Sequence, residues 1–296
     1  MSQLVIDALV LGSIYLLFCL GMSISWGTID ILNFAHGGIF MFSAFVASQI
    51  VSHVELGLVA ICVISAVVGA VVSAAIDVLA FQPILRRAKN QRTAELQILI
   101  GGIGIGTIPV AIVQFYTLSE PFGFLRSTYE TTVHSFGGMR LSSTGLVVLG
   151  CALVLTASIA YWLKNTSHGL ALRAIGVDPE TAELMGIKRR QLSLLTMGIS
   201  GGLAGLAGAL LTFNLGAITA ESGETLLIKA FAIIILGGVG STGGAALGAM
   251  ILAFSEVLVL RYTGGGWVDA VGFGLILAVL LLRPQGIFGK KEVRRV

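Results

Sequence analysis

Charged side chains are scarce in this chain of 296 residues, since Asp, Glu, Lys and Arg together make up only 11% of it. A soluble domain usually carries about 25% charged residues, so the chain has too little polar surface for a soluble globule. The same shortage excludes intrinsic disorder, which requires low hydrophobicity and high charge. Apolar residues, in contrast, make up 56%, and the mean hydropathy is +0.96. This composition is typical of a polytopic, all-α membrane protein.

Histidine and cysteine are also few, with four and three residues. They form neither HExxH nor CxxC, so we expect no metal site and no disulfide, and we interpret the cysteines as small packing residues. The chain lacks GxxxxGKS/T, so we do not expect it to hydrolyse ATP alone. A GxGxxG sequence occurs at 238–243, but it lacks the βαβ pattern that flanks a dinucleotide site. We therefore expect no catalytic residues.

Long apolar segments predict the membrane spans. A spanning helix needs about 20 mostly apolar residues. The candidates are 4–26, 31–52, 56–80, 94–117, 144–163, 191–215, 226–240, 243–260 and 267–283. The chain has eight full spans if 226–260 is partly re-entrant, and nine if both of its pieces cross.

Basic residues orient these spans. Fourteen of the 18 Lys and Arg lie in 86–92, 164–190 and the tail 283–296. Loops rich in Lys and Arg stay on the cytoplasmic side, so we assign all three segments, and the C-terminus, to the cytoplasm. The 118–143 loop is assigned to the outside. Nine spans would then place the N-terminus outside, and eight would place it inside.

Glycine is abundant, with 39 residues, and much of it is clustered. Small residues recur at 201–208, at Gly244 and Gly248, and at 99–107. Such spacing favours close packing between membrane helices. A second interpretation is that some of these glycines interrupt helices that line a path, where irregular backbone is tolerated.

Two segments share an apolar stretch, a small polar break and a helix that begins on Gly-Gly: 29–38 and 235–244. Corresponding interruptions in two related halves indicate a transport path between repeats. The candidate path residues are Asn33, His36, Gly37, Gly38, Gly238, Gly240 and Ser241. For His36, a hydrogen-bonded packing role is the alternative. We interpret the acids Asp7, Asp77 and Glu256 as helix-pairing groups rather than as a proton relay.

The loop 164–190 contains a helix with signals at both of its ends. Asp178 can cap its N-terminus, and Pro179 suits the first helical position. Glu180 favours the positive end of the helix dipole, and Gly186 is a natural residue just past the C-terminus. These signals predict a helix of about two turns, which would be marginal alone in water.

A marginal helix between two spans is explained if it docks into a partner. Ala182 and Met185 are three residues apart and are predicted to share the docking face, with Leu184 on its flank. Ala182 allows close approach, and Met185 packs adaptably. The alternative is an ordinary amphipathic surface loop.

Taken with four other stretches, this loop resembles the EAA-type coupling loop of ABC importer permeases, and more narrowly the branched-chain amino-acid (LIV-type, LivH-like) permeases. The matching stretches are NFAHGG at 33–38, ALRA at 171–174, DPETA at 178–182, MGI at 185–187, GGLAGLAG at 201–208, LGGVGS at 236–241 with Gly244, and RPQGIFG at 283–289. They follow in order over nearly the whole chain. At Gly38 the chain departs from the family, because many members carry an acidic residue there, which leaves the pore chemistry and the cargo open.

The resemblance implies a single transmembrane permease domain over 1–296, with the coupling loop at 164–190 and a basic cytoplasmic tail at 283–296. It implies broken helices in two related halves and alternating access driven by partners. Those partners are a second homologous permease, two cytoplasmic ATPases that hold ATP and Mg, and an extracytoplasmic substrate-binding protein, with no nucleic acid. The coupling residues it implies are Arg173, Asp178, Pro179, Glu180, Ala182, Glu183, Met185 and Gly186.

The expected function is therefore the permease subunit of an ABC importer for branched-chain or related amino acids, in the bacterial inner membrane, with no cofactor of its own. Urea or short amides are the alternative cargo. A secondary transporter or channel would need more ionisable groups inside the bundle, and a membrane enzyme would need a catalytic constellation. The sequence alone leaves pairing with itself or with a paralogue open, and the resemblance favours a paralogue.

Overall fold

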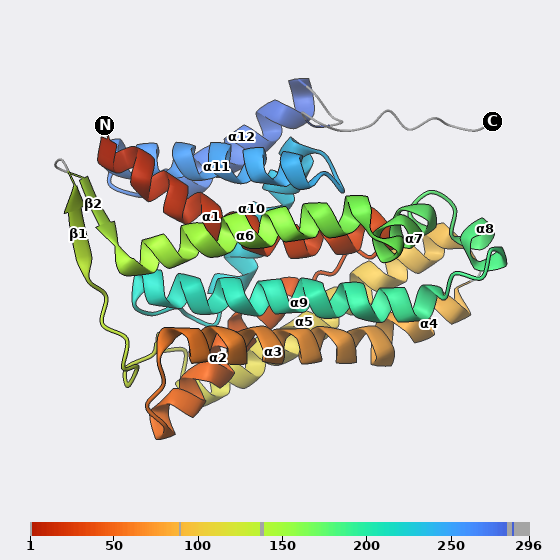
Figure 1. The fold of residues 1–296 in the computed structure, drawn as a ribbon, viewed down its shortest axis with the longest axis horizontal. Coiled ribbons are helices and arrows are strands. Elements are labelled where there is room, and N and C mark those ends of the chain that lie inside the picture. Colours follow the sequence, from red (N-terminus) through yellow and green to blue (C-terminus); the bar gives the residue numbers. More distant parts are fainter. Residues whose placement is uncertain (1, 89, 137–138, 283–285, 287–296) are drawn as a thin grey trace.

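The computed structural model describes residues 2–88, 90–136, 139–282 and 286, and long helices along one axis dominate it (Figure 1). The long helices are α1 (Ser2–Ile29), α5 (Gln91–Thr117), α6 (Ser143–Asn165), α9 (Arg189–Leu215) and α11 (Thr242–Thr263). The shorter ones are α2 (His36–His53), α3 (Leu58–Ile76), α10 (Ser222–Gly237) and α12 (Val268–Leu282). A π-helical turn, η1 (Asp77–Phe81), joins α3 to α4 (Gln82–Arg87). The basic tail predicted at 283–296 lies outside the described residues, apart from Gly286.

Six helical segments of the described chain are long and apolar enough to cross a membrane. They comprise α1, α3 with its continuation to Arg87, α5 from Arg92, α6, α9 and α11. The other three predicted spans correspond to α2, α10 and α12, of 18, 16 and 15 residues. The span predicted at 31–52 is shorter because α2 begins only at His36, after an irregular stretch. The chain is a multi-pass membrane protein.

Different secondary-structure elements lie at the two ends of the bundle. The start of α1 lies beside the hairpin of β1 (Val133–Phe136) and β2 (Met139–Ser142), where the Gln3 side chain bonds both backbone groups of Arg140. At the opposite end lie α4 and two short helices, α7 (Ser167–Ile175) and α8 (Pro179–Leu184) (Figure 1). The basic connections 86–92 and 164–190 therefore share one end, as a common cytoplasmic side requires.

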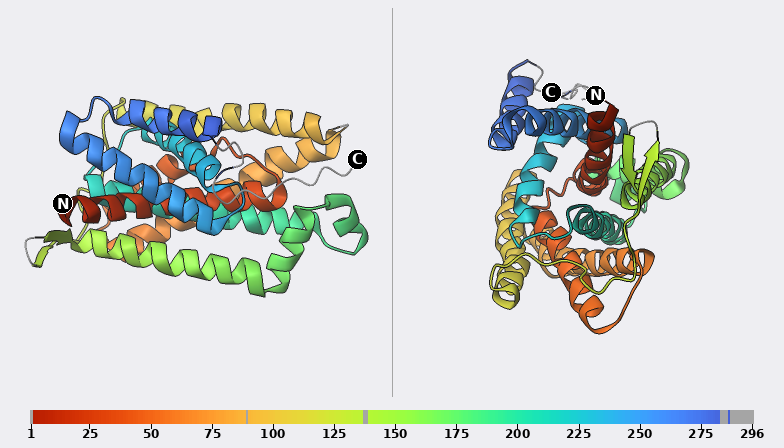
Figure 2. Two further views of the ribbon diagram at one scale, coloured as in Figure 1. Left: turned by 90° about the horizontal axis from the view of Figure 1, so that it is seen from above. Right: turned by 90° about the vertical axis from the view of Figure 1, so that its left-hand side faces the viewer.

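Helix α9 lies near the centre of the bundle, with α5 and α6 on opposite sides of it (Figure 2). Its glycines permit this position. A Cβ on Gly201 would overlap the carbonyl oxygen of Gly69 on α3, and a Cβ on Gly205 would overlap that of Ser65. Gly208 lies equally close to the carbonyl oxygen of Phe40 on α2. The small residues at 201–208 thus pack helices closely, as one of the two interpretations predicted.

The helix contacts divide the bundle into two matching halves, with α1, α2, α3 and α5 in one and α9, α10, α11 and α12 in the other. Helix α3 packs on α9 as α11 packs on α1. Helix α2 packs on α3, α5 and α9, just as α10 packs on α11, α12 and α1. Because α1 starts at the hairpin end and α9 starts at the α8 end, the two halves are inverted relative to each other (Figure 1). Inverted repeats of this kind are common in transporters.

The backbone breaks follow the same symmetry. Helix α1 is followed by Asp30 at φ 57°, and α9 is followed by Gly216 at φ 86°. After Asp30, the amide of His36 donates to the Asn33 carbonyl. At the same distance in sequence after Gly216, the amide of Ser222 donates to the Thr219 carbonyl. Helices α1 and α9 are therefore each followed by a residue with positive φ, and the chain then turns into a short helix.

This equivalence corrects the predicted pairing of 29–38 with 235–244. The structural counterpart of 30–37 is 216–223, whereas 238–241 is a tight turn between α10 and α11. The Gly-Gly at 243–244, which suggested a second break, instead allows close helix packing. Gly244 and Gly237 face each other so closely that a Cβ on either would overlap the backbone of the other.

Candidate functional site

The short helices α2 and α10 begin side by side within the bundle. A Cβ on Gly37 would overlap the carbonyl oxygen of Gly223, and a Cβ on Gly223 would overlap that of Gly37. From this point α2 runs to the hairpin end, and α10 runs to the α8 end. The positive ends of two helix dipoles therefore lie together in the interior, at the seam between the inverted halves.

His36 and Asn33 lie fully buried at this seam. His36 Nε2 is 3.1 Å from the carbonyl oxygen of Phe18, and its ring packs 4.6 Å from the Phe18 ring. Asn33 Oδ1 accepts from the amide of Ala35 at 2.9 Å. Within the described chain, His36 Nδ1 and Asn33 Nδ2 have no hydrogen-bond partner. His36 thus makes the packing contact of the alternative interpretation and still keeps one unused polar atom.

Helix α5 closes the seam from one side through its glycines. A Cβ on Gly38 would come within 2.7 Å of the carbonyl oxygen of Gly106, and a Cβ on Gly106 within 2.9 Å of Ala35 Cα. Gly102 similarly approaches the backbone of Phe34. The glycine at position 38, where the chain departs from the resembled family, is therefore matched to a close backbone contact with α5.

The second predicted group lies elsewhere. Gly238 and Gly240 have φ of 94° and 74°, values that favour glycine, and they form the turn after α10. The Ser241 hydroxyl accepts from the amide of Gly244 at 3.0 Å and caps α11. Gly240 contacts Gly27 near the end of α1. The structure therefore places Gly238, Gly240 and Ser241 at the end of α1 rather than beside His36.

Helix α8 has the termini that the sequence predicts. Asp178 Oδ1 accepts from the amide of Thr181 at 3.0 Å, and Oδ2 accepts from its hydroxyl at 2.6 Å. Pro179 occupies the first turn. Gly186 has φ 86°, and its amide donates to the carbonyl of Glu183 at 2.9 Å.

The predicted docking face of α8 is wrong in one respect. Ala182 is only 4% exposed and belongs to the packed core, whereas Met185 is 80% and Leu184 is 88% exposed. Ala182 and Met185 therefore do not share an outward face. The helix turns its small side chain toward the body of the protein, and an apolar surface of Val177, Leu184 and Met185 is left outside.

Helix α7 connects α8 to the bundle. Its Leu172 and Ile175 are buried, and Gly176 lies against the carbonyl oxygens of Gly27 and Thr28 at the end of α1. Gly27 is thus contacted both by this loop and by Gly240.

The predicted charged residues of the loop lie at its surface. Arg173 is exposed, and its Nη2 donates to the carbonyl of Lys164 at 3.4 Å. Glu180 is exposed as well. Glu183 lines a cavity of about 290 Å³ together with Arg86, Arg189 and Arg190.

Lys229 was not among the residues predicted from the sequence. Its Nζ lies 3.0 Å from each oxygen of Glu256, and the Tyr15 hydroxyl donates to Glu256 Oε2 at 2.7 Å. A lysine within the apolar segment 226–240 was the signal that should have identified it. Glu256 does pair helices, joining α11 to α10 and α1, as predicted.

Asp77 pairs helices as well. Its two oxygens accept from the Gln82 amide at 2.6 Å and from the Ser193 hydroxyl at 2.9 Å, so it joins η1 to α9. Asp7 accepts from Gln3 within α1.

The chain matches a family described as branched-chain amino acid transport system / permease component over residues 4–280. It is 29% identical to the high-affinity branched-chain amino acid transport system permease protein BraD of Pseudomonas aeruginosa, over 99% of this chain and 97% of that protein. LivH of Escherichia coli K12 is 29% identical over the same shares. The autoinducer 2 import system permease protein LsrC of Salmonella choleraesuis is 32% identical over 44% of this chain and 39% of that protein. No solved structure gives a significant match.

Proposed function

Because the chain belongs to the family of branched-chain amino acid transport system permease components, we propose that it is the membrane-spanning subunit of an ABC importer for branched-chain or related amino acids. The observation that carries the proposal is the seam at which α2 and α10 begin, between two inverted halves. In transporters, such broken helices at a repeat interface hold the path. The chain itself contributes no catalysis.

The mechanism we propose is alternating access. Gly37 and Gly223 lie in close backbone contact, and the path would open where the two halves move apart at this contact. Asn33, His36, Gly37 and Gly38 would line that path. Gly238, Gly240 and Ser241 would form its inner mouth, at the end of α1.

Energy would enter at α8. Leu184, Met185 and Val177 form an exposed apolar surface at the end of the bundle, outside the spanning segments. Such a surface supports docking of a partner, and we propose that the partner is one of two cytoplasmic ATPases that bind ATP and Mg. Asp178, Pro179, Glu180 and Gly186 would fix the shape of the docked helix, and Ala182 would hold it to the body. Arg173 and Glu183 would flank the contact.

The proposed location is the bacterial inner membrane, with α8 and the C-terminus in the cytoplasm and the start of α1 outside. The other partners would be a second homologous permease and an extracytoplasmic substrate-binding protein. One partly similar protein is named as an autoinducer 2 import permease, which supports keeping a second cargo class in the proposal. Urea or short amides therefore remain the second candidate cargo.

The test is gentle purification of the tagged chain from its native host. Two ATPase subunits and a second permease should co-purify in near-stoichiometric amounts, and the complex in liposomes should accumulate leucine only with ATP and the binding protein. A stable protein without ATPases, which takes up cargo on an ion gradient, would overturn the proposal.

A further inference from the structure

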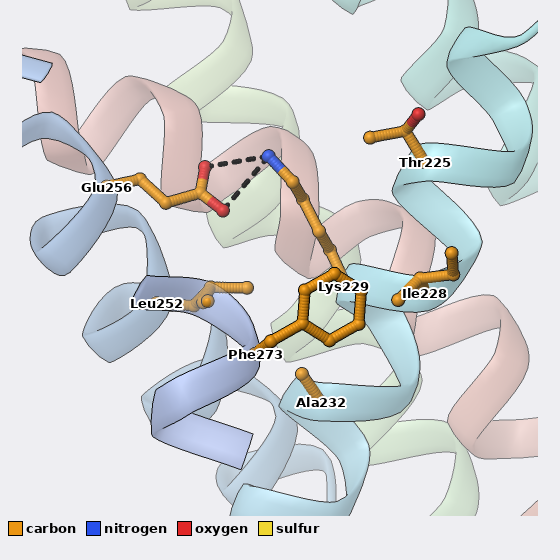
Figure 3. A pocket seen from close by; sticks show the side chains of 8 residues that line it. Thr225, Ile228, Lys229, Ala232, Leu252, Glu256 and Phe273 are labelled. Atoms are coloured by element: carbon orange, nitrogen blue, oxygen red, sulfur yellow. Dashed lines mark hydrogen bonds and ion pairs between the residues drawn. The ribbon is translucent and has the colours of Figure 1, made fainter. Parts of the chain in front are cut away.

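A cavity of about 160 Å³ lies between α10, α11 and α12 (Figure 3). Its lining residues are Thr225, Ile228, Lys229, Ala232, Leu252, Glu256, Gly272 and Phe273. Its lining begins at Thr225, two residues after Gly223 of the α2–α10 seam, so the cavity adjoins the proposed path along α10. The lining is mostly apolar, with one cation and one anion, which is the usual composition of a site for a small molecule.

The two carboxylate oxygens of Glu256 have different hydrogen-bond partners. Glu256 Oε2 accepts hydrogen bonds from Tyr15 and Lys229, at 2.7 and 3.0 Å. Oε1 lies 3.0 Å from Lys229 Nζ but makes no hydrogen bond within the described residues. Lys229 Nζ points to Glu256 across the cavity, with Phe273 beside its stem (Figure 3). One carboxylate oxygen therefore keeps capacity for a further donor.

The fold does not require these charges. In the other half, the helix pair α9 and α3 corresponds to α1 and α11. There Gly201 packs directly against Gly69 and Ser73 on α3. The same helix arrangement is thus built in one half with small residues and in the other with an ion pair. Because charges inside a membrane bundle are costly and usually functional, the pair calls for a role beyond helix packing.

The chemistry of the cavity fits an α-amino acid with a branched apolar side chain. Lys229 and Glu256 are paired with each other in this structure, so a zwitterion would bind by separating them, with its carboxylate at the ammonium of Lys229 and its ammonium at the carboxylate of Glu256. Ile228, Leu252 and Phe273 supply an apolar surface for its side chain. An apolar cavity of about 150 Å³ holds a molecule as large as benzene, so a leucine side chain fits the space.

We propose that this cavity binds the transported amino acid within the permease, with the cargo carboxylate at Lys229 and the cargo ammonium at Glu256. The inference rests on the proposed function and adds a cargo site on this chain. Gly272 keeps the site open, because a Cβ there would lie 3.8 Å from both Glu256 Oε1 and Leu252 Cδ1. Side chains larger than alanine at this position would enter the cavity.

The experiment uses the full complex in lipid nanodiscs and a leucine analogue with a diazirine at its branch point. After irradiation, labelled peptides are identified by mass spectrometry. We expect labels on peptides containing Ile228, Leu252 or Phe273. Excess leucine should remove at least nine-tenths of the label, whereas 4-methylpentanoate, which lacks the ammonium, and isopentylamine, which lacks the carboxylate, should remove little.

Two glycines of α12 give a matched pair of variants. Gly272→Val fills the cavity, whereas Gly274→Val adds the same side chain where nothing lies within 4 Å. We expect Gly272→Val to reduce labelling and ATP-driven leucine uptake at least tenfold, and Gly274→Val to leave both unchanged. The double variant K229M/E256M, which removes both charges together, should lose labelling while still assembling with its partners.

Label outside α10–α12, equal competition by all three compounds, or normal labelling in Gly272→Val would each overturn the cargo site. Failure of the proposed function would look different. The wild-type complex would then accumulate no leucine with ATP and binding protein, whereas labelling and competition would still decide whether the cavity binds an amino acid.

Discussion

Replacement of Gly201 by alanine should destabilise the bundle, although alanine is the better helix former. A Cβ on Gly201 would overlap the carbonyl oxygen of Gly69 and the Cβ of Ser73. The first of these is backbone and cannot rotate away, so α3 and α9 must separate. Overpacking of this kind costs typically about 1–3 kcal/mol, and the rigid neighbour favours the upper part of that range.

Gly198 provides the control, because it lies on the same helix and a Cβ there would meet nothing within 4 Å. Gly→Ala in a helix interior gains about 1 kcal/mol from propensity, and this gain is common to both variants. Gly201→Ala should therefore be less stable than Gly198→Ala by about 1–3 kcal/mol. Reversible unfolding by SDS in mixed micelles, followed by tryptophan fluorescence, measures this difference.

A second substitution separates the two contacts. Ser73→Gly removes the side-chain part of the overlap, so the double variant G201A/S73G should recover only part of the lost stability. Equal stability of Gly201→Ala and Gly198→Ala would refute the claim that α3 and α9 pack backbone to backbone at this point.

Three further predictions concern α8 and the ion pair. Asp178→Ala should cost about 1 kcal/mol of local helix stability, seen as faster hydrogen exchange of the α8 amides with the rest of the chain unchanged. Leu184→Asp should abolish co-purification of ATPases at normal expression, because Leu184 lies on the exposed surface. Ala182→Arg should instead lower the thermal stability of the isolated chain, because Ala182 is buried. Expression and stability equal to wild type for Ala182→Arg would contradict this. Glu256→Gln should destabilise the chain by about 3–5 kcal/mol, since it leaves a buried charge unpaired, and adding Lys229→Met should restore much of the loss in the same unfolding assay.

The sequence predicted features that depend on local chemistry. The capped helix α8 follows from side chains within a few residues of its ends, and Asp178 and Gly186 act as their types require. Most spans follow from apolar length alone. The resemblance carried by 33–38 and 171–187 led to the family that the comparisons show.

Features that depend on distant contacts were missed or wrong. The inward face of Ala182 reflects packing of α8 against the body, which a six-residue helix does not encode. The pairing of 30–37 with 216–223 rests on Asp30 and Gly216, two different residue types that both have positive φ, so the amino-acid sequence does not reveal it. Gly244 was interpreted as part of a break because glycine occurs both where helices pack closely and where a helix is interrupted.

The Lys229–Glu256 pair also constrains how the chain is made. Helix α10 has 16 residues, which at 1.5 Å per residue span about 24 Å, less than the roughly 30 Å of a bilayer core. A lysine near the middle of such a short segment costs about 2.5–3.5 kcal/mol on insertion, so α10 is a poor candidate to leave the translocon alone. Glu256, the partner of this lysine, follows in the chain on α11, which begins after a turn of a few residues. We therefore expect the two helices to enter the lipid together as one neutral hairpin, and we expect the loss of Glu256 to lower membrane insertion before it lowers transport.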